Sequence, residues 1–420
     1  MQLPSMYLCR QKFPRERIEA PAAALNSLLA SSWIGDRVRP GARIAITGGS
    51  RGIAAIVPLV KALVDYLHQL GGRPFVVNAM GSHGGATASG QREVLASLGM
   101  TEENLGCPVC TSMEVEQIGA LGEGFPVWCD CKALEADHLV VINRVKLHTS
   151  LRGPVQSGLC KMLTVGLGKE KQAAHLHRYG PETMGRLVVK AAALAIKKLP
   201  VLAGIAIVEN AYNEVARLEL VRPEDFIAAD TRLLKEAARL QPALPVQELD
   251  LLVVEEMGKC YSGAGLDPHV IGRWRIWGEP EPEFPRIQRV VVLRLAPASH
   301  GNAQGVGLAD FITKELYENI DLETTYKNIL TSTFVQRGMI PIIAATEQQA
   351  IADAIYSLPL AGGKELKVAW IKNTLQLETL ALSEAVLKQL AYNNRIEKLG
   401  PVSWCFNEQG KLNPWVLPCR

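Results

Sequence analysis

The feature that most constrains the fold is an alternation of short apolar runs with longer segments of helical periodicity. Runs such as RIAIT (43–47), PFVVN (74–78) and LAGIAIV (202–208) have the length and apolar density of buried strands. Segments 182–199 and 225–240 carry apolar residues at helical spacing instead. Strands that alternate with helices favour parallel sheets, because a helix returns the chain to the same edge. We therefore predict an α/β fold with mainly parallel sheets.

The best candidate for a linker is Gln241–Pro245, which places two prolines within five residues. A chain of 420 residues is long enough for two or three domains of roughly 100–200 residues each. We predict an N-terminal domain over 1–245 and a C-terminal α/β domain over 246–420. For the C-terminal domain we predict strands at 250–254, 289–295, 341–344 and 366–371, and helices at 308–316, 348–356 and 382–390.

Composition excludes several classes of protein. Lys and Arg number 45 and Asp and Glu 42, and a net charge of +3 is too weak and too evenly spread for a nucleic-acid or anionic membrane partner. No apolar run approaches the roughly 18 residues that a membrane-spanning helix needs. The N-terminus lacks a basic-then-apolar signal pattern, so we expect a cytoplasmic location. We interpret the Cys107/Cys110 and Cys129/Cys131 pairs as ordinary thiols of a reducing cell rather than as a metal or redox site.

Side chains capable of chemistry are concentrated between Asn143 and His177, directly after the apolar run 138–142. Lys146, His148, Arg152, Cys160, Lys161, Lys169, His175 and His177 all fall in this stretch. Loops that follow strands are where α/β proteins build their sites, because the strand fixes the base of the loop. This stretch is therefore the first candidate for a functional site.

Two glycine-rich segments also follow predicted strands. Gly48-Gly49-Ser50-Arg51-Gly52 precedes a long apolar-periodic segment, and this order is typical of a turn that holds an anion at the start of a helix. The turn resembles that of short-chain dehydrogenases, but it lacks G-x-G-x-x-G, and the next strand ends on Asn78 rather than on an acidic residue. His83 lies between small residues after that strand, where an imidazole is expected to face a cleft.

Four features together resemble the nickel-pincer-nucleotide enzymes, the family founded by lactate racemase. They are the strand-end GSHG (81–84), the stretch NRVKLHTSLRGPVQSGLCK (143–161), the His175-x-His177 pair and the loop GAGLDPHVIGR (263–273). The resemblance implies two α/β domains that face a cleft. It also implies a pyridinium mononucleotide whose two sulfur-bearing arms clasp Ni(II), with one arm attached covalently to Lys161.

The same resemblance implies that His177 is the nickel ligand, with His175 as the alternative. Residues two apart on a helix point about 200° apart, so only one of the two can face the metal. Imidazole is a suitable ligand for square-planar Ni(II) with soft partners. His83 and His148 match the two histidines of the family that exchange the hydroxyl proton while hydride leaves and returns at C2 of a 2-hydroxy acid.

Further roles follow from the chemistry that this resemblance implies. A substrate carboxylate needs a cation, for which Arg51 and Arg273 are the candidates. The nucleotide phosphate is expected near Gly48, Ser50 and Arg51, with Lys259 as a further candidate. Gly48 stands where the family has an acidic residue, and Ile271 and Gly272 stand where it has tyrosine and glutamine. These differences line the substrate pocket and predict another hydroxy acid, such as a sugar acid.

The sequence thus predicts a cytoplasmic racemase or epimerase that depends on cofactor-biosynthesis proteins for maturation, with its oligomeric state left open. Two alternatives remain. One is an NAD(P)-dependent oxidoreductase that uses the TGGSRG turn, which predicts nicotinamide binding without a metal. The other is a non-catalytic relative that binds the cofactor or a ligand without hydride turnover.

Overall fold

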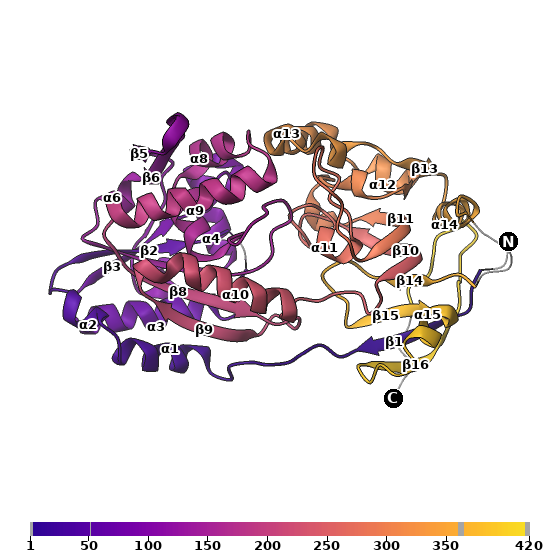
Figure 1. The fold of residues 1–420 in the computed structure, drawn as a ribbon, viewed down its shortest axis with the longest axis horizontal. Coiled ribbons are helices and arrows are strands. Elements are labelled where there is room, and N and C mark those ends of the chain that lie inside the picture. Colours follow the sequence, from indigo (N-terminus) through magenta and orange to yellow (C-terminus); the bar gives the residue numbers. More distant parts are fainter. Residues whose placement is uncertain (1–2, 51, 360–364, 416–420) are drawn as a thin grey trace. The chain divides into compact units, whose positions relative to one another are not determined.

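The computed structural model describes residues 3–50, 52–359 and 365–415, and it divides the chain into two compact units. One unit comprises Pro14–Gln241, and the other combines Met1–Phe13 with Pro242–Arg420. Each unit contains its own mainly parallel sheet with helices around it (Figure 1). The predicted α/β fold class is therefore confirmed.

The Pro14–Gln241 unit is built on a six-stranded sheet in the order β4-β3-β2-β7-β8-β9. The first five strands are parallel, and only β9 runs antiparallel to its neighbour β8. The strands are β2 (Arg43–Gly48), β3 (Arg73–Asn78), β4 (Val109–Cys110), β7 (His138–Arg144), β8 (Val201–Glu209) and β9 (Val215–Val221), and a separate hairpin pairs β5 (Val115–Ala120) with β6 (Pro126–Asp130).

Helices cover both faces of this sheet, which is why its strands are nearly continuous apolar runs. Ala203, Ile205 and Ile207 of β8 belong to one core together with α1 and α3. Gly204, between them, faces the other side, where a Cβ would lie 2.6 Å from both Leu159 and Phe226. The helices are α1 (Pro21–Ala30), α2 (Ile34–Arg37), α3 (Ile56–Gln69), α4 (Ala88–Ser97), α5 (Glu102–Leu105), α6 (Cys131–Leu134), α7 (Gly158–Lys161), α8 (Lys169–Leu176), α9 (Pro181–Lys198) and α10 (Phe226–Leu240).

The second unit contains an eight-stranded sheet in the order β13-β12-β11-β10-β14-β15-β1-β16. The strands from β13 to β14 are parallel, and those from β14 to β16 pair antiparallel. The strands are β1 (Met6–Gln11), β10 (Glu248–Met257), β11 (Arg286–Leu295), β12 (Phe311–Thr313), β13 (Ile342–Ala344), β14 (Val368–Ile371), β15 (Thr379–Ser383) and β16 (Ile396–Val402).

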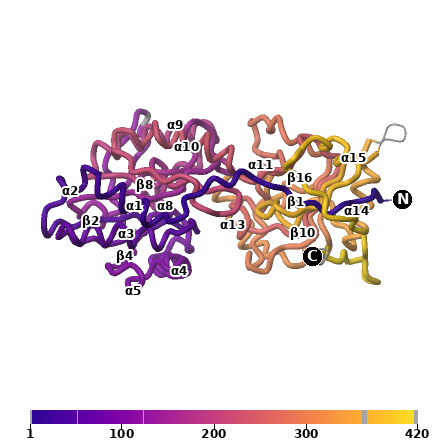
Figure 2. Tube along the Cα trace, turned by 90° about the horizontal axis from the view of Figure 1, so that it is seen from below, coloured from indigo at the N-terminus to yellow at the C-terminus, as the bar shows by residue number. Residues whose placement is uncertain are grey.

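The N-terminal strand β1 therefore lies in the sheet of the C-terminal unit, between β15 and β16. Figure 2 shows its indigo trace among the yellow strands of the chain's other end. The predicted division at residue 245 lies close to the structural one at 241/242, but the prediction kept the first thirteen residues with the N-terminal domain.

Apolar cores lie on both faces of the eight-stranded sheet. Leu252 and Val254 of β10 belong to one cluster, whereas Leu251 and Val253 belong to the other, as the twofold alternation of a strand requires. The helices of this unit are α11 (Pro268–Ile271), α12 (Lys314–Glu318), α13 (Leu322–Ser332), α14 (Glu347–Tyr356) and α15 (Glu384–Gln389).

The predicted helix over 308–316 is wrong. Phe311–Thr313 is the buried strand β12, which pairs with β11 and β13, and only Lys314–Glu318 is helical. Thr313 caps this short helix by accepting the N–H of Leu316, so the strand passes into the helix without a loop. The predicted helix over 382–390 is also shorter, because β15 extends to Ser383.

Among the residues that the structure describes, we find no helix with both the length and the apolar character needed to cross a membrane.

Candidate functional site at the carboxyl edge of the first sheet

Three loops of the Pro14–Gln241 unit leave neighbouring parallel strands at the same edge of the sheet. They follow β2, β3 and β7, which are adjacent and parallel, and they carry Gly48–Ser50, His83 and His148 respectively. Open α/β sheets bind ligands at this carboxyl edge. The topology therefore brings to one edge of one sheet residues that are separated in sequence by as much as 100 positions.

The loops after β2 and β3 pack against the segment that follows Lys161. A Cβ on Gly49 would lie 3.2 Å from Cε of Met162, so a larger residue at this position would crowd the helix. The backbone N–H of Gly81 donates to the carbonyl of Gly166 at 3.3 Å. Ser50 is half-buried in the turn, and the predicted cofactor and substrate residue Arg51 lies outside the described residues.

The glycine at position 48 has a packing reason of its own. Its Cβ would lie 2.9 Å from Leu95 and 3.1 Å from Val76, closer than side chains normally approach. Gly48 ends β2 with Leu95 of α4 packed against it, so a larger residue would require Leu95 and Val76 to shift, whether or not a phosphate binds there.

The loop that carries His83 is held by the buried amide of Gln91 in α4. Its Nε2 donates to the carbonyls of Gly81 at 2.9 Å and His83 at 3.0 Å. Its Oε1 accepts from Nδ2 of Asn78, the buried residue that ends β3 and also bonds the backbone of Ser112. The loop is thereby fixed at both its ends, while the His83 side chain is exposed.

The loop after β7 fixes the ring of His148. The Nδ1 atom accepts the backbone N–H groups of Ser150 at 3.1 Å and Leu151 at 3.0 Å. The backbone N–H of His148 donates to Oε1 of Gln156 at 3.0 Å, which closes the loop across its neck. An imidazole whose Nδ1 is an acceptor carries its neutral-form proton on Nε2, so Nε2 is the nitrogen that His148 offers to a ligand.

Lys161 is the last residue of α7, and a carboxylate distant in sequence caps this short helix. Asp230 of α10 is fully buried and accepts the N–H groups of Leu159 at 3.0 Å and Cys160 at 2.8 Å. Gly158 has φ of +82°, and a Cβ there would lie 2.2 Å from Oδ1 of Asp230. Burial raises the pKa of Asp230 to about 6, against the lowering effect of the two N–H donors.

A π-helical turn, Met162–Gly166, separates Lys161 from α8. Such turns are rare in proteins overall but are enriched at functional sites. The wider turn changes the direction in which the side chains after it point. His177 comes at the end of α8, and the positive charge of Lys161 acts on it. Burial first and this charge second lower the pKa of His177 to about 4, so its imidazole is neutral at pH 7.

His175 faces a different environment from His177. Its ring lies 5.2 Å from that of Phe125 and 5.7 Å from that of Trp128, both of which belong to the β5–β6 hairpin or its turn. The two histidines thus point in different directions, as their spacing predicted. His177 therefore stays the predicted metal ligand, with His175 as the alternative.

The start of α8 is fixed by a buried ion pair that the sequence did not single out. Nζ of Lys169 lies 2.9 Å from Oδ2 of Asp130, and each side chain is about 1% exposed. The same ammonium donates to the carbonyl of Asn78, so it connects α8 to the end of β3. Burial lowers the pKa of Lys169, and the attraction of Asp130 opposes this effect.

A second ion pair holds the far end of the β2 loop. Glu209 at the end of β8 accepts the N–H of Ala54 and pairs with Arg144 at the end of β7, and both side chains are mostly buried. The sequence offered a signal for this contact, because Glu209 directly follows the predicted run 202–208 and Arg144 lies two residues after the run 138–142. Their pairing required the knowledge that β7 and β8 are neighbours.

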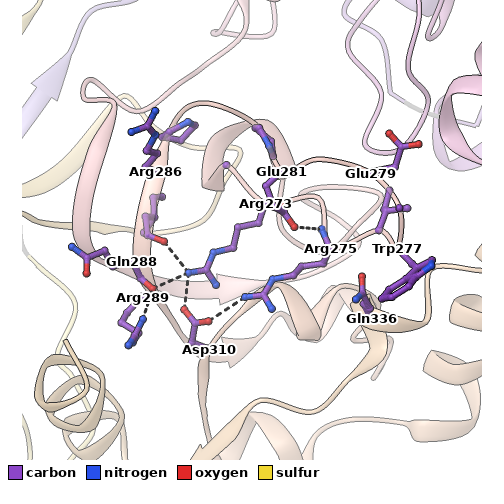
Figure 3. Close-up of a pocket in the computed structure, with 16 residues that line it drawn as sticks. Arg273, Arg275, Trp277, Glu279, Glu281, Arg286, Gln288, Arg289, Asp310 and Gln336 are labelled. Carbon is purple, nitrogen blue, oxygen red and sulfur yellow. Dashed lines mark hydrogen bonds and ion pairs between the residues drawn. The ribbon is translucent and has the colours of Figure 1, made fainter. Parts of the chain in front are cut away.

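The two remaining predicted residues, Lys259 and Arg273, lie in the other unit. Lys259 follows β10 and donates to Oδ1 of Asn328. Arg273 is buried and donates to the carbonyls of Leu308 and Ile287 as well as to Asp310 (Figure 3). Its guanidinium therefore connects its own loop to the start of β11 and to the residues just before β12. Since these contacts occupy it, we do not propose it as a substrate ligand.

Within the described parts of the chain, no three His, Cys, Asp or Glu side chains are grouped so that they could hold a metal ion by themselves.

Comparison with known proteins bears on the fold. A family model described as a domain of unknown function (DUF362) matches residues 49–234. The lactate racemase apoprotein from Thermoanaerobacterium thermosaccharolyticum is similar in structure, with a TM-score of 0.54 and 12% identity over 87% of this chain and 96% of that one. A protein from Thermotoga maritima gives a TM-score of 0.51 and 12% identity over 86% and 97%. No curated protein matches the sequence. The chain thus shares the fold of lactate racemase.

Proposed function

We propose that this chain is a racemase or epimerase of a 2-hydroxy acid that depends on a nickel-pincer nucleotide. The observation that carries the proposal is the placement of Lys161 and His177. Both lie on the helical segment that follows β7, with the π-helical turn Met162–Gly166 between them, and this turn bonds the loop after β3 through Gly166 and Gly81. The positive charge of Lys161 also contributes to the lowered pKa of His177. The loops of His83 and His148 both leave the carboxyl edge of the sheet.

The residues present fit such a cofactor. Lys161 supplies an amine at the end of a capped helix, where an arm of the cofactor would be attached. His177 supplies a neutral imidazole, which is the form that binds a metal. The absence of a three-residue metal cluster in the described parts of the chain agrees with a nickel ion whose other ligands belong to the cofactor.

When bound, the cofactor supplies a hydride acceptor for C2 of the substrate. The protein must then exchange the hydroxyl proton, and His83 is placed for this task on a loop held rigidly by Gln91. His148 donates a hydrogen bond from Nε2 to the substrate oxygen as that oxygen becomes a carbonyl. To take a proton at Nε2 itself, His148 must first release the N–H groups of Ser150 and Leu151.

The substrate is proposed to be a hydroxy acid other than lactate. Gly48 has no side chain, so this position lacks the acidic group that the family carries there. It packs tightly against Leu95 and Val76. A pocket without that carboxylate can accept a more polar acid, such as a sugar acid. Maturation by cofactor-biosynthesis proteins and a cytoplasmic location belong to the same proposal.

The test is intact-mass analysis with nickel quantification on protein made in a host that also synthesises the cofactor. We expect a mass increase on the peptide that contains Lys161 and about one nickel per chain, as one covalently attached cofactor requires. Lys161→Ala should abolish the mass increase, and His177→Ala should lose nickel.

The matched control is His175→Ala, which removes an imidazole two residues away and should retain nickel. His83→Ala should keep the cofactor and lose turnover of hydroxy acids. Protein that carries neither added mass nor nickel in this host would overturn the proposal, as would equal nickel loss in the His175 and His177 variants.

A further inference from the structure

A pocket in the Met1–Phe13/Pro242–Arg420 unit lies outside the residues used by the proposed function. It has a volume of about 770 Å³ and is lined by the loop 272–289 with Asp310 and Gln336 (Figure 3). An adjoining hollow of about 480 Å³ shares Arg275, Arg289, Asp310 and Gln336 with it. The volume is in the range of small-molecule sites. The pocket lies where β11 and β12 begin, whereas Lys259 follows the end of β10.

Four guanidinium groups line this pocket, against the carboxylates of Asp310, Glu279 and Glu281. Asp310 lies between two of the four, at 2.7 Å from Arg273 and 3.3 Å from Arg275. Arg273 is buried and directs its other contacts to main-chain carbonyls. Arg275 keeps 41% of its side chain exposed, so it offers further N–H donors to the pocket.

The other two arginines add positive charge: Arg289 donates to neutral acceptors, and the ion pair of Arg286 with Glu248 is long and exposed. Arg289 donates to Oγ and the carbonyl of Ser357 and to the carbonyl of Gln288, which are neutral acceptors. Arg286 is 61% exposed, and its nearest carboxylate oxygen, on Glu248, is 3.9 Å away. The wall of the pocket around Arg275 is therefore suited to an anion.

The backbone at Arg275 is held in a conformation that non-glycine residues rarely adopt, with φ of +46°. Glu281 stabilises it, because its carboxylate accepts the N–H groups of both Trp274 and Arg275. Because these two hydrogen bonds use the carboxylate of Glu281, this residue supports the backbone. It does not compete with a ligand for the guanidinium of Arg275. Strained backbone that neighbouring groups hold in place is concentrated at ligand sites.

An aromatic surface adjoins these charges. Trp277 lines the same pocket and is 89% exposed, an unusual state for the largest apolar side chain (Figure 3). A flat indole beside guanidinium groups suits a ligand that combines a planar ring with an oxyanion, since the ring stacks while the oxyanion accepts hydrogen bonds.

We infer that this pocket binds a planar organic oxyanion, held by Arg275 through its carboxylate or phosphate group and by Trp277 through its ring. All the residues of this site belong to the Met1–Phe13/Pro242–Arg420 unit, whereas Lys161 and His177 belong to the other unit.

The test is isothermal titration calorimetry of the full chain, prepared without cofactor, with four probes. Adenosine 5′-monophosphate represents a planar phosphate ester and nicotinate a planar carboxylate, whereas adenosine and inorganic phosphate each lack one of the two features. We expect saturable binding of at least one of the first two, tighter than that of adenosine or phosphate. Which of the two binds identifies the anionic group.

Two variants assign the binding to this pocket. Arg275→Gln should weaken it roughly ten- to hundred-fold, the usual effect of losing a charge-assisted contact. Trp277→Ala, at an exposed position where the fold is not at risk, should weaken the planar probes. Arg232→Gln is the control, since it removes an exposed arginine that is also paired with a carboxylate, that of Glu219, in the other unit. The inference is refuted if neither planar probe binds at millimolar concentration, or if both pocket variants bind like the control.

Discussion

The cap that Asp230 provides to α7 can be tested by replacing it with asparagine. The carboxylate satisfies two buried N–H groups with two oxygens, at 3.0 Å to Leu159 and 2.8 Å to Cys160. A protonated carboxyl still offers lone pairs on both oxygens, whereas an amide has one acceptor oxygen, so in Asp230→Asn one N–H would face an NH₂ group. Leaving a buried donor unsatisfied costs about 1–3 kcal/mol. We therefore expect Asp230→Asn to be less stable than the wild type at acidic pH.

The difference between the two proteins should depend on pH. Burial raises the pKa of Asp230 from 3.8 to about 6 in the folded chain. Between these values the folded state binds more protons than the unfolded state, so the contribution of Asp230 to stability is fully present below pH 3.8 and is lost as the pH rises through 6. The shift in the pKa corresponds to about 3 kcal/mol of stability. Asparagine does not titrate, so the variant does not show this dependence on pH.

The assay is amide hydrogen exchange of the peptide that contains α7, measured by mass spectrometry and corrected for the intrinsic pH dependence of exchange. Local exchange is preferable to global unfolding because a chain of two units need not unfold in one step. The free energy of opening of the wild type should exceed that of Asp230→Asn at pH 4. By pH 7 the difference should have changed by about 2 kcal/mol in favour of Asp230→Asn, which removes or reverses it. A difference that stays constant over this range would show that the carboxyl does not titrate there.

Three further substitutions test neighbouring contacts. Gly158→Ala should destabilise the chain by about 3 kcal/mol or more, because φ is +82° and a Cβ would meet Asp230; an unchanged melting temperature would contradict this. Lys169→Met should lower the free energy of unfolding in urea by about 3–5 kcal/mol, because it leaves the buried charge of Asp130 without its cation, and adding Asp130→Asn, which keeps the Oδ1 atom that accepts the N–H of Ala133, should recover much of the loss; a double variant no better than the single one would argue against the pair. Gln91→Leu should accelerate amide exchange over 79–84, the loop of His83, and exchange at the wild-type rate would show that Gln91 does not hold it.

Much of the architecture could be predicted because it depends on local pattern. Continuous apolar runs such as 43–47 and 202–208 are strands buried on both faces, and their alternation with amphipathic helices indicates a parallel sheet. The predicted helix over 348–356 is α14, Glu347–Tyr356, with an N-cap at Thr346. These elements are determined by residues within a few positions of one another.

The elements that sequence misplaced depend on partners far away in the chain. Phe311–Thr313 consists of aromatic and β-branched residues, but the helix-forming residues of 314–318 follow it directly, so the local sequence does not decide between strand and helix. Only the pairing with β11 and β13 makes this segment a strand. The first strand, Met6–Gln11, could not be assigned to the second sheet, because its partners lie nearly 400 residues later.

For the candidate site, the sequence by itself determined which side chains follow strand ends and that His175 and His177 must point in different directions. Only the tertiary structure decided that His175 packs on Phe125, that Gln91 holds the His83 loop and that Asp230 caps the helix of Lys161. The physical reason is that helical spacing is fixed by the backbone alone. The partner of a buried polar group is instead whichever chain segment the packing of the sheet and its helices brings within hydrogen-bonding distance.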